Sequence, residues 1–331
     1  VSILKTIYRT DKDSKSLIII NDHTPGIEKI FPGLIENGFF DYLLQVPFKK
    51  IANKIKKDKL VLSRILKRNK NAIEFVDANS EILKYDEFIR SSEINLFSNF
   101  GLTPVYILLK YKKNYIRMLE EGEGSYASRI GYLQAFKRKY ILNTVVGDGL
   151  DKEIKEIQVQ FPEKLSKRLR KKGKKLDLKK MRDDLSIEDR EKMLKVFTSG
   201  LEMDLTGKKK LLLITQPLEE IYMTENKKVK LYNQLLKPYA DDYNIYIKPH
   251  PRELTDYHGK LNYNFTTIPG GFPLEMFDLL NGVNFELGIT VCSSALYNMK
   301  CVDKKIILGR EYLKKPLPAN WQELNFKDSI G

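Results

Sequence analysis

Short apolar runs alternate with amphipathic segments along the first half of the chain. The run at residues 17–20 is followed by polar, glycine and proline residues, which is typical of a buried strand leaving a sheet. Downstream, the pattern predicts mixed helix and strand at 27–48, a helix at 84–100, a strand at 104–111, a strand with its loop at 115–129, and a helix at 129–142. Strands that alternate with helices form parallel sheets, so we expect an α/β fold.

The second half repeats this alternation more regularly. Residues 226–240 have helical spacing, with Val229, Leu231, Leu235 and Leu236 on one side. Strands are predicted at 209–218, 244–249, 264–269, 284–291 and 304–309, and helices at 273–280 and from residue 293 onward. This succession describes a Rossmann-like domain.

A segment of different character separates the two α/β regions. The stretch from Lys164 to Arg182 is dense in lysine and arginine and poor in apolar residues. We therefore expect an N-terminal Rossmann-like domain at 1–150, a basic connector at 151–200 and a C-terminal Rossmann-like domain at 201–331. The predicted architecture is α/β, with the two Rossmann-like domains facing each other across a cleft.

The composition agrees with a soluble protein of two domains. The 331 residues are 42% hydrophobic and 31% charged. Apolar runs fall short of the roughly 18 residues that a membrane span needs, and the first residues carry charges where a signal peptide is apolar. The two cysteines, Cys292 and Cys301, are too few for a disulfide scaffold or a zinc site of their own, so we expect a cytoplasmic protein.

A formal net charge of +15 calls for a polyanionic partner. Nucleic acid, an anionic membrane surface and a phosphorylated substrate all satisfy it. The stretch from Lys164 to Arg182 is either a solvated helical face or a surface that binds an anionic membrane or an acceptor. Its near lack of aromatic residues argues against nucleic acid.

The segment KPHPRE places a histidine between two prolines at the end of a predicted strand. Pro249 and Pro251 restrict the backbone on both sides of His250. Ligands bind at the carboxyl ends of strands in open α/β sheets, and Lys248 and Arg252 add positive charge there, although Lys248 can point elsewhere. A fixed imidazole can donate a hydrogen bond or a proton to a phosphate oxygen. The alternative is a structural histidine in a loop.

Two further segments carry candidate chemistry. Ser293 and Ser294 stand where a predicted strand gives way to a helix, so they form either a phosphate cradle or a plain N-cap. Glu120 and Glu121 end a predicted strand before the turn at Gly122. One carboxylate there can serve as general base for a hydroxyl nucleophile, and the alternative is an acidic surface turn.

Other motifs offer less. The sequence DKD at residues 11–13 lies in a polar stretch and is interpreted as a turn. His23 and His258 have no evident partners in sequence. The sequence holds no Walker loop, no G-x-G-x-x-G and no cluster with metal-ligand spacing, which removes the usual support for kinases, dehydrogenases and zinc enzymes.

Together the three segments resemble the bacterial sialyltransferases of glycosyltransferase family 52, which include lipooligosaccharide sialyltransferases. The family's acidic, HP and serine motifs correspond to Glu120-Glu121-Gly122, His250-Pro251 and Ser293-Ser294. The segments ITQPLEE and IPGGFPLE are also similar. The resemblance implies a GT-B fold and an inverting transfer of sialic acid from CMP-sialic acid to a sugar hydroxyl, usually galactose of a surface glycan such as lipooligosaccharide or capsule.

The resemblance also implies roles for residues. Glu121 is expected to be the base, with Glu120 second, in an N-terminal acceptor-side domain. His250 and the two serines would stabilise the departing phosphate. The remaining donor-side candidates of the C-terminal CMP-binding domain are Lys248, Pro249, Arg252 and Gly270. A monophosphate leaving group makes a metal ion less necessary, so no metal and no cofactor are expected.

The expected partners are CMP-sialic acid and a galactose-containing glycan or glycolipid, not nucleic acid. The basic stretch would hold the enzyme peripherally on the inner face of the cell membrane. The acceptor, the linkage (2,3, 2,6 or 2,8), polymerisation and the oligomeric state, for which a homodimer is one option, stay open. The alternatives are a CDP-glycerol-type phosphotransferase, another nucleotide-sugar glycosyltransferase on a similar scaffold, and a non-enzymatic basic protein that binds lipid or nucleic acid.

Overall fold

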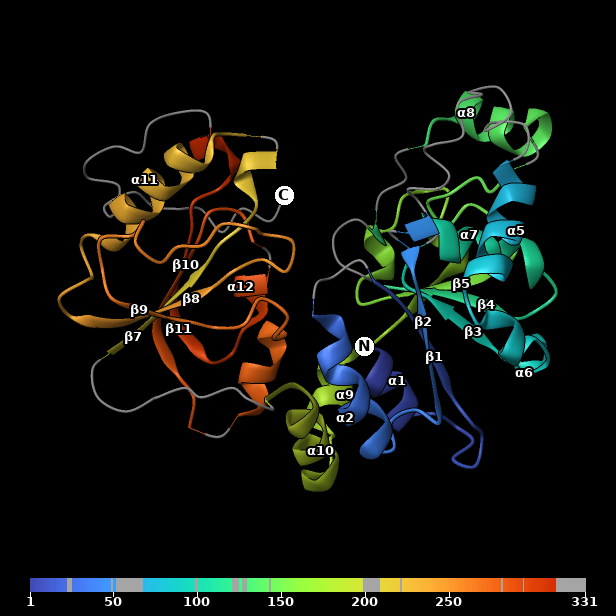
Figure 1. Ribbon diagram of the computed structural model, residues 1–331, viewed down its shortest axis with the longest axis horizontal. Coiled ribbons are helices and arrows are strands. Elements are labelled where there is room, and N and C mark those ends of the chain that lie inside the picture. The colour runs from blue at the N-terminus through green and yellow to red at the C-terminus, as the bar shows by residue number, and fades with distance from the viewer. Residues whose placement is uncertain are drawn as a thin grey trace. The chain divides into compact units, whose positions relative to one another are not determined.

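The chain folds into two compact units, each with its own parallel sheet (Figure 1). Unit 1 comprises Val1–His23 and Gly38–Ser186, and unit 2 comprises Thr24–Asn37 and Ile187–Gly331. The computed structural model describes residues 1–22, 26–48, 50–51, 68–98, 101–120, 125–126, 130–142, 144–198, 209–220, 222–280, 282–293 and 295–313. The predicted α/β class with two parallel-sheet regions is confirmed.

The main sheet of unit 1 has four parallel strands in chain order. They are β3 (Ile94–Leu96), β4 (Ile116–Leu119), β5 (Ile154–Val159) and β6 (Gly173–Lys175). A separate parallel pair is formed by β1 (Leu17–Asn21) and β2 (Tyr42–Val46). Because β5 and β6 belong to this sheet, the predicted basic connector contributes two strands to unit 1, and the unit ends at Ser186, not at residue 150.

Helices and shorter helical turns connect or flank the strands of unit 1. The α-helices are α1 (Ser2–Ile7), α5 (Arg68–Asn79), α6 (Asp86–Ser91), α7 (Leu102–Lys110), α8 (Tyr132–Phe136) and α9 (Leu178–Asp183). Shorter turns are the 3-10 helices η2 (Ile82–Tyr85), η5 (Pro162–Lys164) and η6 (Arg170–Lys172), and the π-helix η4 (Lys137–Ile141). η4 continues α8 directly, so residues 132–141 are helical, as predicted.

Two predictions in unit 1 are wrong. Residues 104–111 were expected to form a strand, but most of them lie in α7. This helix is buried from Val105 to Leu108, and a helix that is apolar all round has the same continuous run as a strand of a parallel sheet. One helix is predicted over residues 84–100, whereas the described residues 84–98 hold the end of η2, then α6 and β3.

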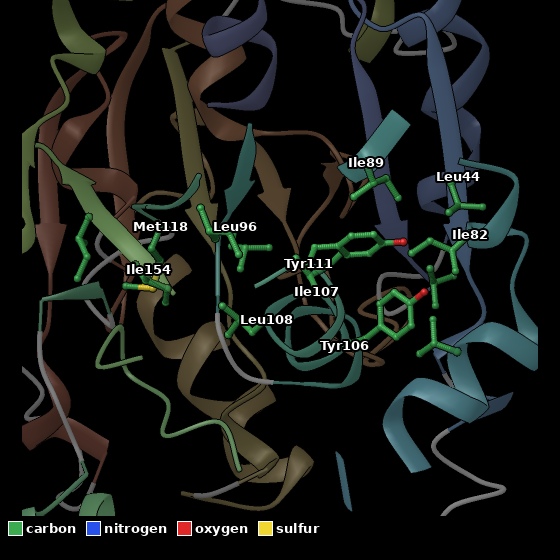
Figure 2. Packing of buried hydrophobic residues seen from close by; sticks show 14 of the residues in the cluster. Leu44, Ile82, Ile89, Leu96, Tyr106, Ile107, Leu108, Tyr111, Met118 and Ile154 are labelled. Carbon is green, nitrogen blue, oxygen red and sulfur yellow. The ribbon is translucent and has the colours of Figure 1, made fainter. Parts of the chain in front are cut away.

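The core of unit 1 lies between its strands and α5, α6 and α7. Figure 2 shows Tyr106 and Tyr111 inside this cluster of leucine, isoleucine and methionine side chains. Their hydroxyls donate to Asp77 (2.6 Å) and Asp86 (2.9 Å), and burial raises the pKa of Tyr111 to about 12. Leu165 also joins this core, so the basic stretch is anchored in unit 1.

Unit 2 is built on a five-stranded parallel sheet. The strands are β7 (Lys209–Ile214), β8 (Tyr243–Lys248), β9 (Phe265–Thr267), β10 (Phe285–Thr290) and β11 (Val302–Ile307). Their order across the sheet is β9-β8-β7-β10-β11. This is the 3-2-1-4-5 order of doubly wound folds, in which the chain reverses direction across the sheet between the first and fourth strands. The five strands predicted for this region are confirmed.

Helices of unit 2 come from two parts of the chain. The α-helices are α2 (Phe31–Glu36), α10 (Ile187–Thr198), α11 (Glu225–Leu236) and α12 (Ala295–Asn298), and the 3-10 helices are η1 (Ile27–Ile30), η7 (Leu218–Glu220), η8 (Leu274–Leu279) and η9 (Arg310–Leu313). Helix α2 packs on α10 at Gly33, where an added Cβ would lie 3.1 Å from the Cα of Val196. An early segment of the chain thus completes unit 2.

A glycine in β10 lets α12 lie directly on the sheet. An added Cβ at Gly288 would come within 2.5 Å of Leu296 and 2.8 Å of Val302. Helix α12 has four residues, so the helix predicted from residue 293 is a single turn. None of the helices in the described part of the chain is both long and apolar enough to cross a membrane.

Candidate functional site

His250 lies just beyond the carboxyl end of β8, as predicted. The backbone N–H of Arg252 donates to Nδ1 of the imidazole at 3.1 Å. Nδ1 is therefore an acceptor, and the proton of the neutral ring lies on Nε2. Partial burial and the positive charge of Arg252 lower the pKa of His250. At neutral pH the residue is a neutral imidazole that offers an N–H from Nε2.

A buried carboxylate holds the histidine loop. The side chain of Glu253 has no exposed surface. It accepts hydrogen bonds from the backbone N–H of His250 (3.2 Å), from the hydroxyls of Thr215 and Tyr257, and from Nζ of Lys228 at 2.6 Å. A buried charge is tolerated only when it is paired and fully hydrogen-bonded, and Glu253 meets both conditions.

Lys228 is the counterion of this carboxylate and is itself fully buried on α11. Its ammonium also donates to Glu219 (2.5 Å) and to the hydroxyl of Thr255 (2.7 Å). Sequence reasoning missed this network. The available signal was the position of Lys228 four residues before Tyr232, on the buried side of the helix.

Lys248, expected to bind the donor, has its ammonium directed at the backbone. It is buried, and Nζ donates to the carbonyls of Pro249 (2.9 Å) and Gly270 (2.7 Å). Burial lowers its pKa to about 8. Lys248 therefore fastens the loop after β8 to the loop after β9. The guanidinium of Arg252, in contrast, is half exposed and lies 3.8 Å from Glu220.

The edge between β7 and β10 carries further polar groups. Cys292 donates to the side-chain oxygen of Gln216 at 2.5 Å, which links the ends of the two strands. Ser293 donates its N–H to the hydroxyl of Thr290 (3.3 Å), and its own hydroxyl accepts from the N–H of Ala295 (3.4 Å). Ser293 thus caps α12. Ser294 lies outside the described residues.

The strand order brings these groups to one edge of unit 2. Because β8, β7 and β10 are neighbours and parallel, His250, Gln216 and Ser293 all follow the carboxyl ends of adjacent strands. The N–H of Thr215 also donates to the carbonyl of Lys248 at 3.1 Å. One sheet edge thus holds an imidazole N–H, an amide side chain and a hydroxyl. Such groups suit a phosphate or another polar ligand.

In unit 1, Glu120 follows β4 at the corresponding edge. Its carboxylate accepts from the hydroxyl of Tyr126 (2.8 Å) and from the backbone and side-chain N–H groups of Gln160 (2.6 and 3.0 Å). Burial and this carboxylate raise the pKa of Tyr126. Glu120 is therefore engaged in joining the ends of β4 and β5. Glu121 and Gly122 lie outside the described residues.

The weaker candidates from the sequence contact residues that are close to them along the chain. The N–H of Asp13 donates to the side chain of Asp11 at 3.0 Å, which makes the predicted turn. His258 is exposed and stacks on Phe265 at a centroid distance of 4.9 Å. His23 lies outside the described residues. Within the described residues, no three His, Cys, Asp or Glu side chains gather as metal ligands would.

Comparisons with known proteins identify a family whose model spans the region that carries these residues. The family model described as Glycosyltransferase family 52 matches residues 38–310. An uncharacterized protein of Haemophilus influenzae is 31% identical over 197 residues, which are 58% of this chain and 61% of that protein. The chain thus matches less than two thirds of that relative's length.

A solved structure is similar at a lower level. The crystal structure of UDP-GlcNAc 2-epimerase from Neisseria meningitidis bound to UDP-GlcNAc aligns over 86% of this chain and 79% of its own, with 12% identity and a TM-score of 0.39.

Proposed function

Because the chain belongs to glycosyltransferase family 52, we propose that it is an inverting sialyltransferase that uses CMP-sialic acid. The acceptor would be a sugar hydroxyl, with terminal galactose of a bacterial lipooligosaccharide or capsule as the first candidate. The observation that supports this most is the state of His250, a neutral imidazole whose Nε2 carries the proton at the carboxyl end of β8.

The donor side requires stabilisation of the departing CMP. Its phosphate gains negative charge as the bond to the sugar breaks, and a fixed donor helps most where charge develops. We assign this role to Nε2–H of His250, with the half-exposed guanidinium of Arg252 next to it. Lys248, Pro249 and Gly270 would act indirectly, since their contacts hold the loop in place.

The serine motif would contribute on the same edge. Ser293 already caps α12, so its hydroxyl would reach the phosphate only as part of a rearranged or shared contact. Ser294 is the second candidate of the motif. Both belong to the proposal as donor-side residues.

The acceptor side requires a base for the attacking hydroxyl. Glu120 is held by three hydrogen bonds from neutral donors, which suits a residue that positions its neighbour. We therefore assign the base to Glu121, with Glu120 as its support. A positioned general base typically contributes about 100- to 10,000-fold to the rate.

The test is an assay of the purified chain with CMP-sialic acid and a panel of galactosides, followed by linkage analysis of the product. CDP-glycerol and UDP-sugars are offered side by side. We expect release of CMP that depends on a galactoside. Turnover of CDP-glycerol alone would identify a phosphotransferase instead and contradict the proposal.

Substitutions of His250 and His258 provide a variant and its matched control. His250→Ala should lower kcat about 100- to 1000-fold, as expected for loss of one transition-state donor. His258→Ala removes an exposed imidazole from the same unit and should leave kcat unchanged. A fully active, folded His250→Ala protein would refute the assignment of the donor site.

A further inference from the structure

The helical segment 132–141 of unit 1 exposes an unusual amount of apolar surface. In Figure 1, α8 lies at one end of unit 1, away from β3, β4 and β5. Scattered exposed apolar side chains are ordinary, but a contiguous set marks an interaction surface. The exposed side chains are Tyr132 (77%), Leu133 (83%), Phe136 (55%), Tyr140 (64%) and Ile141 (64%).

Most of these side chains share one face of the helix. Tyr132, Phe136 and Tyr140 follow one another at a spacing of four residues, and Leu133 lies beside them. The rings of Phe136 and Tyr140 are in contact, with centroids 4.9 Å apart. The result is a stripe of large apolar groups along a helix of two to three turns.

Positive charge surrounds the stripe. Lys139 lies over the ring of Tyr140 at 5.0 Å, and the guanidinium of Arg168 lies over the ring of Tyr132 at 4.4 Å. Lys137 is exposed on the same helix. The sequence from residue 125 to residue 147 has four basic residues and no aspartate or glutamate. The surface therefore complements an anionic partner with an apolar interior.

We propose that residues 132–141 form an interfacial helix that binds an anionic phospholipid bilayer. The apolar stripe would enter the boundary between headgroups and acyl chains, and Lys137, Lys139 and Arg168 would contact phosphates. Ten helical residues extend roughly 15 Å, so the helix lies on the membrane and does not cross it. The proposal does not rest on the donor or acceptor assigned above.

Other occupants fit less well. A two-fold dimer through this face would bring two copies of the Lys137 and Lys139 charges into one interface, and like charges repel. Nucleic acid would use aromatic stacking, but Leu133 and Ile141 are aliphatic and have no ring to stack. Aliphatic and aromatic groups with flanking lysines are what a lipid interface accommodates.

The basic stretch from Lys164 to Arg182 contributes Arg168 to this surface. Two cations of that stretch also make contacts within unit 1: Arg168 donates one N–H to the carbonyl of Ile130, and Lys172 donates to the carbonyls of Gly149 and Asp151. Arg168 is the residue that connects the stretch to the apolar helix.

Sedimentation of the full chain with vesicles tests the proposal. Vesicles of phosphatidylcholine alone are compared with vesicles that also contain phosphatidylglycerol, in a salt series. We expect binding to the anionic vesicles that weakens as salt rises. The variant Leu133→Ser/Phe136→Ser/Tyr140→Ser should bind at least about 100-fold more weakly. Lys137→Ser/Lys139→Ser should lose roughly fivefold for each lysine near an anionic surface.

Matched controls remove similar groups elsewhere. Ile187→Ser/Leu254→Ser deletes two side chains that are 79% and 89% exposed, and Lys112→Ser/Lys113→Ser deletes two exposed lysines of unit 1. Both should bind vesicles like the unchanged protein. In Phe136→Trp the new fluorophore should shift to the blue and be quenched by brominated lipid, whereas Tyr297→Trp should not respond.

Four outcomes of the binding experiments would overturn the proposal. They are no binding to anionic vesicles, equal binding to neutral and anionic vesicles, full binding by the triple serine variant, and preferential capture of a single-stranded oligonucleotide. Sedimentation velocity without lipid tests the remaining alternative, a second copy of the chain bound at this face. A dimer that the triple serine variant dissociates would make this face a contact between copies.

Discussion

The two units each place a carboxylate at the carboxyl edge of a parallel sheet, but they surround it differently. In unit 2, Glu253 is buried against the ammonium of Lys228. In unit 1, Glu120 accepts only from a tyrosine and a glutamine among its described contacts. Both carboxylates have structural roles, since their hydrogen bonds join segments of the fold. The chemistry we propose belongs to a neighbour in sequence, His250 in unit 2 and Glu121 in unit 1.

The largest expected effect separates the two glutamates of unit 1. Glu121→Gln should lower kcat about 100- to 10,000-fold, because it removes a general base without changing shape. Glu120→Gln keeps its size and should lower kcat less, with a lower melting temperature. Steady-state kinetics measure kcat of the two variants, and thermal melts measure their melting temperatures. Equal loss of kcat in both variants would contradict the division of roles.

The next effect concerns the ion pair of Glu253, which has no counterpart among the described contacts of Glu120. Lys228→Met should destabilise unit 2 by about 3–5 kcal/mol, because Glu253 keeps a buried charge without its counterion. Unfolding in urea measures the loss. Tyr126→Phe, which removes one hydrogen bond from Glu120, is the matched change in unit 1 and should cost about 1.5–3 kcal/mol. A Lys228→Met protein as stable as the unchanged chain would show that the pair is dispensable.

A third effect appears as a pH dependence of stability. The pKa of Lys248 is about 8 in the folded protein and 10.5 for the ordinary side chain. Between these values the unfolded state binds more protons, so the contribution of Lys248 to stability should rise with pH, by about 3 kcal/mol in total. Below pH 8 that contribution is lost. The difference between the unchanged chain and Lys248→Met, measured from pH 7 to 10.5, isolates it from other groups.

The smallest effect tests the electrostatics of the histidine. The positive charge of Arg252 disfavours protonated His250, so Arg252→Met should raise the pKa of His250 toward its ordinary value. Ring-proton NMR titration measures it, since the chain has three histidines and His250→Ala assigns the signal. Arg90→Met, a change of an exposed arginine in unit 1, should leave the titration alone. An unchanged or lower pKa in Arg252→Met would contradict the assigned cause.

Sequence reasoning succeeded where local pattern determines structure. The strands of unit 2 are buried runs with turn residues at their ends, and the prolines around His250 mark the end of β8. It failed at α7, whose all-round burial hides its period, and at β6, a three-residue strand with two lysines that exists only through its pairing with β5. At the acidic segment, pattern alone leaves a general base and a surface turn as alternatives, and the resemblance to family 52 is what favours Glu121 as the base.

The support of the candidate site could not be found from sequence, for a physical reason. Lys228 and Glu253 are 25 residues apart. Helical spacing puts Lys228 on the buried side of α11, but nothing near either residue identifies the other as its partner. Only the packing of α11 on the sheet brings the two side chains together. Lys248 is similar, since its partner carbonyl at Gly270 lies 22 residues away.

The packing of α2 on α10 has a consequence for how the protein is made. About 150 residues separate the two helices, so at roughly 5–20 residues per second α2 leaves the ribosome on the order of 10 to 30 s before its partner exists. The part of unit 2 that is synthesised last therefore completes its fold by packing against α2, which is synthesised early. A gene fragment that begins at residue 187 would encode an incomplete body and is a poor choice for expression.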